Sequence, residues 1–291
     1  MKHRTALPVA ASVSAFALAL VLGACSPGSD DEADGDAGAT ISHIHGVAVG
    51  PEDGKLYVAT HDGIYTPDAE GHPELVGDRK DDFMGFALGK SGAFLASGHP
   101  APGRDAPSNL GLIESTDTGR TWKDKSLSGK VDFHALEYAH ETVYGYDSTN
   151  GLLRVSADGV TWDDRASLTA LDIAVSPRDP DTVLATAEQG LLRSTDGGRT
   201  FASVTGPTPA FVSWATQDAL FAVDPTGALS VSRDGGAGWS ERGTVPGGAP
   251  QALTALDGQR LVVASQDGVY ESRDGGKTFD RKLDVAASGD H

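Results

Sequence analysis

One short turn motif recurs about every 40 residues, and this repeat constrains the fold more than any other feature. Each copy has a serine, an aspartate two positions later, one to three glycines, and then an aromatic side chain. The copies are Ser115–Trp122, Ser156–Trp162, Ser194–Phe201, Ser232–Trp239 and Ser272–Phe279. A repeat of this length with a glycine-rich turn is typical of a β-propeller, in which each repeat forms one four-stranded blade.

Between the turns the sequence contains short apolar or alternating segments of strand length, and no segment with helical periodicity competes with them. These segments form six units, the first of which has only a degenerate turn between Thr66 and Gly71. Residues 41–284 are therefore predicted to form one all-β domain, a six-bladed β-propeller, with 285–291 as a tail. Five or seven blades are the alternatives. Ring closure is expected from packing between the first and last blades, unless residues 39–42 add an outer strand.

The N-terminus has the pattern of an export signal. Lys2 and Arg4 precede an apolar stretch, residues 7–22, that is short for a membrane span. The stretch is followed by Cys25, the only cysteine, and residues 22–25 form a Leu-Gly-Ala-Cys segment that resembles the bacterial lipobox. This resemblance implies a lipoprotein signal peptide over 1–24 and a lipid on Cys25 that holds the protein on the extracytoplasmic face of a cell membrane. The alternative is a plain secretory signal with a chance cysteine.

Charge and composition narrow the classes of partner. Residues 25–40 combine acidic side chains with glycine and serine and contain no lysine or arginine, which predicts a solvated tether. The formal net charge of −18 should repel nucleic acid, so DNA and RNA are excluded as partners. The acidic character either serves solubility or attracts cationic ligands, including metal ions. With a single cysteine, no intramolecular disulfide can form.

Ligands of propellers bind at the mouth of the central channel. The mouth face, as we call it, is formed by the loops that lead into each innermost strand and by the connections from second to third strands. Five histidines of the first three units are predicted to lie on this face: His43, His45, His61, His99 and His134. Together with nearby carboxylates they predict a zinc or copper site, with the carboxylates orienting the imidazoles. The alternative is a hydrogen-bonded channel lining that binds no metal.

Further ligand-binding residues are expected at the same mouth: Asp82, Asp132, Asp147 and Arg104. Arg104 lies on the connection from His99 to Asn109, the longest between predicted strands. A long loop at a propeller mouth is often a lid or a specificity element. An insertion without a role is the alternative.

The repeated turn resembles the Asp-box, or BNR repeat, of sialidases and related propellers. In that family the turns join the third and fourth strands, away from the functional face. Together with the segments His43–Gly46, Met84–Phe86, Ser97–Pro100 and Asp132–His134, the turns resemble a family of bacterial Asp-box lipoproteins labelled glycosylhydrolase-like or exo-α-sialidase-like. This resemblance implies the propeller fold and a possible glycoside hydrolase activity.

Sialidase chemistry needs three arginines that bind the substrate carboxylate and a tyrosine nucleophile. Arg79, Arg104 and Arg165 are expected on mouth loops, but none stands in a sialidase-like sequence. The leading hypothesis is therefore a surface-anchored propeller that binds a small ligand, such as a metal ion, at a mouth lined by histidine and aspartate. The alternatives are a glycoside hydrolase acting on extracellular glycans, with a site unlike that of sialidases, and a scaffold or assembly factor.

Overall fold

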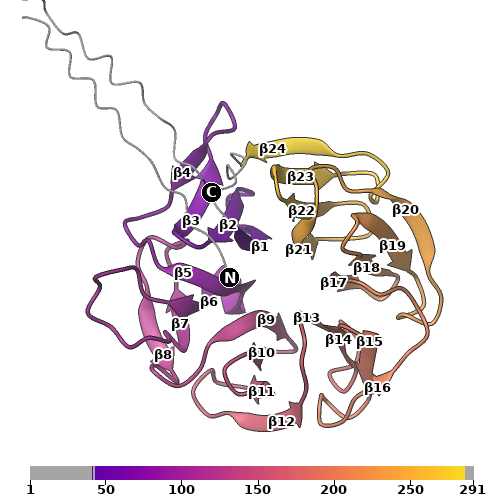
Figure 1. Ribbon diagram of the computed structural model, residues 1–291, viewed down its shortest axis with the longest axis horizontal. Helices are drawn as coiled ribbons and strands as arrows, with labels where there is room; N and C mark the ends of the chain where they lie inside the picture. The colour runs from indigo at the N-terminus through magenta and orange to yellow at the C-terminus, as the bar shows by residue number, and fades with distance from the viewer. Residues whose placement is uncertain (1–40, 42, 286–291) are drawn as a thin grey trace, which may run out of the picture. The chain divides into compact units, whose positions relative to one another are not determined.

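A computed structural model describes residues 41 and 43–285. The predicted signal peptide (1–24), the lipidated Cys25 and the tether (25–40) lie outside these residues, as does nearly all of the predicted tail. The described part contains six four-stranded antiparallel sheets, and in each sheet the strands are adjacent in chain order. Figure 1 shows these sheets as six blades around a common centre. The prediction of an all-β, six-bladed propeller is confirmed.

The strands have the following bounds. Blade 1 contains β1 (Ile44–Val49), β2 (Leu56–Thr60), β3 (Gly63–Pro67) and β4 (Pro73–Leu75). Blade 2 contains β5 (Asp82–Leu88), β6 (Phe94–His99), β7 (Leu112–Ser115) and β8 (Lys123–Ser126). Blade 3 contains β9 (Phe133–Ala139), β10 (Thr142–Asp147), β11 (Leu152–Ser156) and β12 (Asp163–Ser167).

The second half of the ring continues in the same way. Blade 4 contains β13 (Asp172–Val175), β14 (Val183–Ala187), β15 (Gly190–Ser194) and β16 (Ala202–Ser203). Blade 5 contains β17 (Phe211–Thr216), β18 (Ala219–Val223), β19 (Ala228–Ser232) and β20 (Ser240–Thr244). Blade 6 contains β21 (Pro250–Ala255), β22 (Leu261–Ser265), β23 (Gly268–Ser272) and β24 (Asp280–Asp284). A short 3₁₀ turn, η1 (Lys90–Gly92), joins β5 to β6. Within the residues described, no helix has the length and apolar character needed to cross a membrane.

The repeated turns connect third strands to fourth strands, and their hydrogen bonds explain the spacing of serine, aspartate and glycine. Ser194 is buried; its hydroxyl donates to Asp196 Oδ1 at 2.7 Å and accepts the Gly198 amide at 2.8 Å. Asp196 in turn accepts the backbone amide and the hydroxyl of Thr200. Gly198 has a φ of 86°, which favours glycine. Each turn therefore satisfies its own backbone groups, and the motif can recur in blade after blade.

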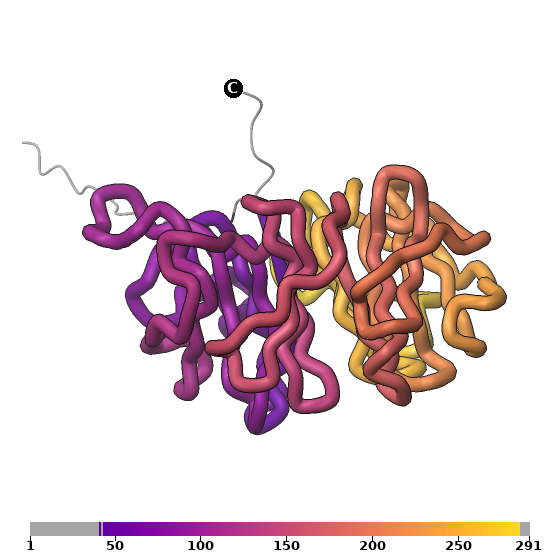
Figure 2. The backbone as a smooth tube through the Cα atoms, turned by 90° about the horizontal axis from the view of Figure 1, so that it is seen from below, coloured from indigo at the N-terminus to yellow at the C-terminus, as the bar shows by residue number. Residues whose placement is uncertain are grey.

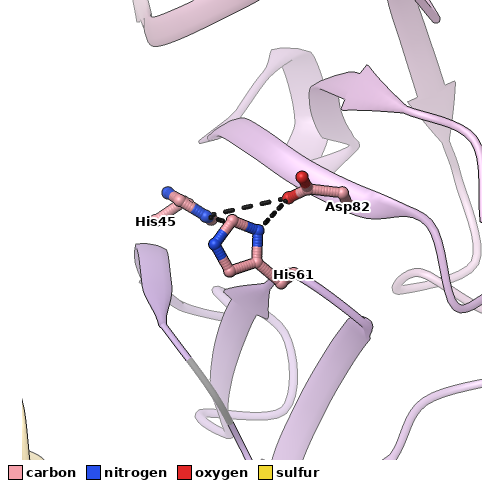
Figure 3. A group of neighbouring side chains, drawn as sticks. All are labelled: His45, His61 and Asp82. Atoms are coloured by element: carbon pink, nitrogen blue, oxygen red, sulfur yellow. Dashed lines mark hydrogen bonds and ion pairs between the residues drawn. The ribbon is translucent and has the colours of Figure 1, made fainter. Parts of the chain in front are cut away.

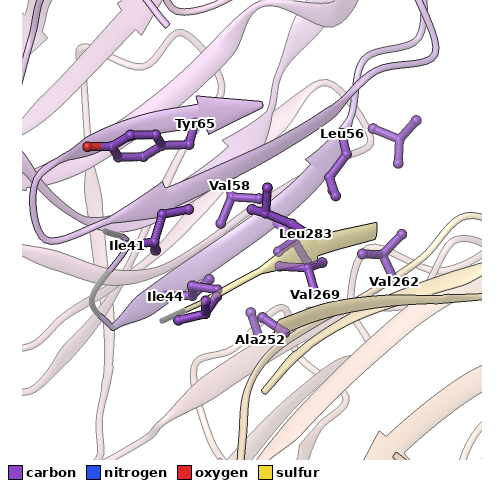
Figure 4. Packing of buried hydrophobic residues seen from close by; sticks show 13 residues of the cluster. Ile41, Ile44, Leu56, Val58, Tyr65, Ala252, Val262, Val269 and Leu283 are labelled. Carbon is purple, nitrogen blue, oxygen red and sulfur yellow. The ribbon is translucent and has the colours of Figure 1, made fainter. Parts of the chain in front are cut away.

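Side-chain packing closes the ring between blades 1 and 6 (Figure 4). Ile44, Val47 and Val58 from blade 1 lie in one buried cluster with Val262 and Leu283 from blade 6. Two hydrogen bonds also cross this junction: the Ile44 amide donates to Gln251 Oε1 at 3.0 Å, and the Thr254 hydroxyl donates to the Val47 carbonyl at 2.6 Å. Among the described residues, neither blade gains a fifth strand, so closure rests on packing.

Seen from the side, the propeller is a flat ring whose strands run between its two faces (Figure 2). The innermost strands begin at the mouth face, and the turns from second to third strands lie at the same face. The repeated turns and the turns from first to second strands lie at the opposite face. This arrangement gathers the ends of many strands on one surface, where side chains from different blades can meet.

Candidate metal centre

Two of the predicted histidines are the extra residues of β-bulges at the start of innermost strands. In blade 1, Ile44 pairs with Thr60 and Gly46 pairs with Ala59, so His45 is the unpaired residue between them. In blade 3 the same irregularity leaves His134 unpaired between Phe133 and Ala135. A bulge re-aims its extra side chain. Both histidines line the central cavity of the propeller, and this placement depends on the local irregularity of their strands.

His61 and Asp82 come from adjacent blades. His61 follows β2 in the tight turn to β3, where the Asp62 amide donates to the hydroxyl of the buried Thr60 at 3.2 Å. Gly63 closes this turn with a φ of 136°, a value that disfavours other residues. Asp82 is the first residue of β5 in the next blade. The turn therefore presents the His61 ring toward the beginning of the neighbouring blade.

His45, His61 and Asp82 bring three potential ligand atoms together at the mouth (Figure 3). His61 Nδ1 lies 2.9 Å from Asp82 Oδ1 and 3.3 Å from His45 Nε2, and His45 Nε2 lies 3.7 Å from Asp82 Oδ1. In a tetrahedral zinc site with bonds of about 2.0–2.1 Å, ligand atoms are about 3.3–3.4 Å apart. The three separations lie around that value, so a small adjustment would place all three atoms on one ion.

The hydrogen bonding of Asp82 Oδ1 indicates whether these residues suit a bound cation. The atom is buried and accepts no well-aligned hydrogen bond from any described residue, although the His61 ring nitrogen lies close to it. A buried carboxylate oxygen without a hydrogen bond is costly unless a positive charge compensates it. A metal ion bound between the three side chains would supply that charge. The donor set therefore fits a cation.

His45 is held in the neutral form. Its pKa is lowered to about 3, mainly by burial and also by the nearby His61, His43 and His134 rings, while Asp132 opposes the change. A metal binds the unprotonated imidazole, so protons would not compete for His45 at neutral pH. His43 lies beside this group, with its ring centroid 5.6 Å from that of His45 and 5.2 Å from that of His61.

The other two predicted histidines bind a different carboxylate. His134 Nε2 lies 2.7 Å from Asp132 Oδ2, and His99 Nε2 lies 3.3 Å from the same oxygen. Asp132 is only 3% exposed. His99 Nδ1 lies 2.9 Å from the Ser108 carbonyl, which can only accept, so this nitrogen carries a proton. Of the five predicted metal ligands, the structure thus places His45 and His61 at Asp82, with His43 beside their rings, and the other two at Asp132.

Asp147 and Arg104, also predicted to bind a ligand, have partners within the fold. Asp147 is fully buried and accepts from Arg154 Nε at 2.8 Å and from Asn150 Nδ2 at 2.7 Å. Arg104 donates to the buried Asp81 at 2.7 Å, and Arg79 contacts the same carboxylate. These ion pairs anchor the long loop and the third blade. The ligand-binding roles of Asp147 and Arg104 stay predictions.

The expected place of Arg165 on a mouth loop is wrong. Arg165 lies within β12, an outermost strand, and its guanidinium contacts the Gly197 carbonyl in the repeated turn of the next blade. The position follows from the chain direction: the repeated turns lie opposite the mouth, so the first residues of a fourth strand remain near that opposite face. Arg165 therefore joins two neighbouring blades at their periphery, far from the channel mouth.

Two channel residues were missed by the sequence analysis. Glu137 and Asp172 line the same cavity, about 230 Å³ in volume, as His45 and His134. Burial, together with the nearby charge of Asp172, raises the pKa of Glu137 to about 8. Burial also raises the pKa of Asp172 to about 7, although hydrogen bonds from the backbone amides of Val212 and Ile173 act to lower it. The available signal was an acidic residue inside each of two predicted innermost strands, an unusual position in an apolar segment.

No family model and no curated protein matches this sequence. Solved structures do match its fold. The Niastella koreensis GH74 enzyme has a TM-score of 0.61 at 16% identity, over 85% of this chain and 46% of its own. The GH74 xyloglucanase from Xanthomonas campestris has a TM-score of 0.54 at 17% identity, and the match covers 84% of this chain and 46% of the xyloglucanase. A catalytically inactive histidine-to-alanine variant of virginiamycin B lyase from Staphylococcus aureus, bound to quinupristin, has a TM-score of 0.57 at 13% identity, over 86% of both chains.

This chain spans less than half the length of the GH74 enzymes that it matches. At these identities the likeness shows the fold alone. The neighbours are enzymes of different chemistry on a shared propeller architecture, and function in such a fold depends on the individual site.

Proposed function

We propose that this protein is a surface-anchored lipoprotein whose propeller binds a divalent transition-metal ion at its mouth through His45, His61 and Asp82. The observation that carries the proposal is the convergence of two imidazole nitrogens and one carboxylate oxygen within metal-ligand spacing. The lowered pKa of His45 and the buried Asp82 oxygen without a hydrogen bond support it. Two nitrogens and one oxygen are a donor set suited to zinc or copper(II).

The site has room for chemistry beyond simple binding. Three protein ligands leave a fourth position for water or a ligand, as in catalytic zinc sites. The Asp132–His134 pair lies beside the first group, and a buried carboxylate that holds an imidazole fixes its tautomer and orientation. These residues would bind and orient a small molecule that reaches the mouth. Attachment through Cys25, which the sequence predicts, would hold the site on the extracytoplasmic face, where extracellular ions and glycans are accessible.

Calorimetric titration with Zn²⁺ and Cu²⁺ tests the proposal on protein purified without a histidine tag. Wild type should bind one of these ions tightly, and His61→Ala should lose that binding while its melting temperature without metal is unchanged. His72→Ala is the matched control, because His72 is exposed in the β3–β4 turn and pairs only with Asp68 among the described residues. Weak and equal binding by wild type and His61→Ala would overturn the proposal.

A glycoside hydrolase is the second candidate. It is favoured by Asp82 and Asp132, two carboxylates at the mouth of a fold that is shared with GH74 enzymes. Hydrolysis of glycosides uses a pair of carboxyl groups on either side of the bond. Release of reducing ends from xyloglucan or other extracellular glycans, lost in Asp132→Asn, would establish this activity. A scaffold role has less support, because the large apolar side chains exposed on the described surface, Val160 and Leu171, lie on separate loops.

A further inference from the structure

A second group of potential ligand atoms surrounds Asp132, apart from the three atoms at Asp82. His134 Nε2 lies 2.7 Å from Asp132 Oδ2, and His99 Nε2 lies 3.3 Å from the same oxygen. Asp132 directly precedes β9 in blade 3, whereas His99 is the last residue of β6 in blade 2. This group therefore joins two neighbouring blades, as the group at Asp82 does, and it offers the same two kinds of donor, imidazole nitrogen and carboxylate oxygen.

The backbone around Asp132 is held in place from both blades. The Ser148 amide, just after β10, donates to the Asp132 carbonyl at 3.0 Å. The next residue, Phe133, donates its amide to the hydroxyl of the buried Ser97 in β6 at 2.9 Å. Because the start of β9 is fixed on two sides, the Asp132 carboxylate needs little further ordering to bind a ligand.

His99 has the hydrogen bonding that is usual for a metal-bound histidine. Its Nδ1 donates to the Ser108 carbonyl at 2.9 Å, and a histidine ligand almost always donates its second ring nitrogen to a carbonyl or a carboxylate. With the proton on Nδ1, the neutral ring has a lone pair on Nε2, the atom that lies 3.3 Å from Asp132 Oδ2. Two lone pairs this close repel each other unless a cation, either a proton or a metal ion, lies between them.

The charge of Asp132 is poorly compensated. The residue is buried, and its Oδ1 accepts no hydrogen bond from any described residue. In the described part of the chain it forms ion pairs only with His99 and His134, and with no lysine or arginine. The Ser148 hydroxyl lies 3.1 Å from the Asp132 carbonyl and 3.3 Å from Oδ2, and its single proton cannot serve both well. A buried carboxylate in these surroundings is costly unless a positive charge lies beside it.

We propose that Asp132, His99 and His134 bind a second transition-metal ion at the mouth, beside the ion proposed at Asp82. Two nitrogens and one oxygen suit zinc or copper(II). The separation of His99 Nε2 from Asp132 Oδ2 already matches the spacing of about 3.3–3.4 Å around a tetrahedral ion. His134 Nε2 must move away from Asp132 by about 0.6 Å to reach that spacing. Its side chain is partly exposed and can rotate by this amount.

The second ion should bind more weakly than the first. His134 Nε2 and Asp132 Oδ2 share a proton across 2.7 Å, and a metal ion must displace it. Asp82 Oδ1 accepts no well-aligned hydrogen bond, so no such proton is displaced from it. The charge of an ion already bound at Asp82 also opposes the entry of a second cation. Two phases should therefore be visible in a titration with metal.

Calorimetric titration of metal-free protein with Zn²⁺ counts the ions and separates the two sites. Wild type should bind two ions, His99→Ala should keep only the tighter phase, and His61→Ala should keep only the weaker phase. His99 is partly exposed, so water can replace its bond to the Ser108 carbonyl, and the metal-free melting temperature of His99→Ala should equal that of wild type. His72→Ala, at an exposed position, is the control for unspecific binding and should bind two ions.

The outcomes separate this proposal from the proposed function. One ion in wild type, lost in His61→Ala and kept in His99→Ala, would overturn the second site and leave the proposed function intact. One ion lost in His99→Ala alone would support the site at Asp132 and overturn the proposed function instead. Loss of all zinc binding in either variant would show one shared ion and overturn a separate second site, and absence of binding in wild type would overturn both.

Diffraction at the zinc absorption edge, from crystals soaked in zinc, gives an independent readout of the ligands. A second anomalous peak should lie about 2.0–2.1 Å from His99 Nε2 and about 2.0–2.2 Å from an oxygen of Asp132. A peak at Asp82 alone would overturn the second site, because His99 would then be a protonated partner of Asp132 and not a metal ligand.

Discussion

Asp82 and His99 face each other across strands β5 and β6, and this pair joins two groups of side chains at the mouth. Asp82 contacts His45 and His61 from blade 1, whereas His99 contacts Asp132 from blade 3. Directly opposed residues in a sheet have Cβ atoms about 4.5–5.5 Å apart. The two groups therefore lie side by side across three consecutive blades, although each has its own carboxylate.

This arrangement predicts unequal effects of histidine substitutions on zinc affinity. Loss of even an outer partner lowers metal affinity about 10- to 100-fold, so His61→Ala, which removes a direct ligand, should lower it by at least about 100-fold. His134→Ala should have a smaller effect, because His134 binds Asp132 and not the Asp82 group. Calorimetry on the two variants and their combination measures the difference. Equal losses in both single variants would instead indicate one ion shared by all four histidines.

Ser194→Ala should destabilise the propeller by about 1–3 kcal/mol, because the substitution leaves the buried Gly198 amide without its acceptor. Metal binding should be unaffected, since the repeated turns lie opposite the mouth. Chemical denaturation measures the free energy of unfolding, and Ser203→Ala at an exposed position is the matched control. A stability equal to that of wild type would show that the Ser194 hydroxyl does not hold the turn together.

Stability should also fall in acid through the repeated turns. Asp117 accepts hydrogen bonds from the Thr121 amide and hydroxyl and from Ser115, and its pKa is lowered to about 2 despite partial desolvation. A carboxyl whose pKa is lower in the folded state than in the unfolded chain stabilises the fold at pH values above its unfolded-state pKa. This contribution to stability is lost as the pH falls from about 4 to about 2. Melting temperatures of Asp117→Asn and wild type should therefore converge at about pH 2. A constant difference over that range would contradict the linkage.

Glu137→Gln should have the opposite pH dependence. The pKa of Glu137 is raised from its ordinary value of 4.5 to about 8, so the folded protein binds this proton more tightly than the unfolded chain. The folded state is then penalised progressively as the pH rises through this window. The variant, which carries no charge, should melt at a higher temperature than wild type at about pH 8 and show a smaller difference at about pH 5. Thermal melts test this, and a difference that does not grow with pH would argue against a protonated Glu137 in the folded protein.

Cys25→Ser should move the protein from the membrane fraction to the soluble fraction. The prediction rests on the lipobox-like segment that ends at Cys25. One acyl chain anchors a protein only marginally, but a bacterial lipoprotein cysteine carries several. Fractionation of cells, with detergent extraction as the control, measures the change. Continued sedimentation of the variant would show that the apolar segment, residues 7–22, anchors the protein by itself.

The sequence predicted the architecture in detail because the relevant interactions are local. In each repeated turn, serine, aspartate and glycine bond within a few residues of one another, as Ser194, Asp196 and Gly198 do. Such a motif forms the same turn wherever it occurs in the chain. The prediction that five histidines gather at the mouth face rested on the same regular topology, because the start of an innermost strand always lies at one face.

The grouping of those histidines was decided by tertiary structure. His45 and His134 point into the channel because each is the extra residue of a bulge, and pairing irregularities of this kind leave no clear pattern in the sequence. His99 meets Asp132 rather than His61 because a blade places the end of its second strand against the beginning of the next blade.

The sequence by itself thus determined the repeat, the turns and the face on which the polar residues gather, since each depends on contacts within one blade. Only the tertiary structure decided which carboxylate each imidazole meets, and that Glu137 and Asp172 line the same central cavity. The physical reason is that distances between side chains of different blades, and the desolvation that shifts their pKa values, exist only once the ring has closed.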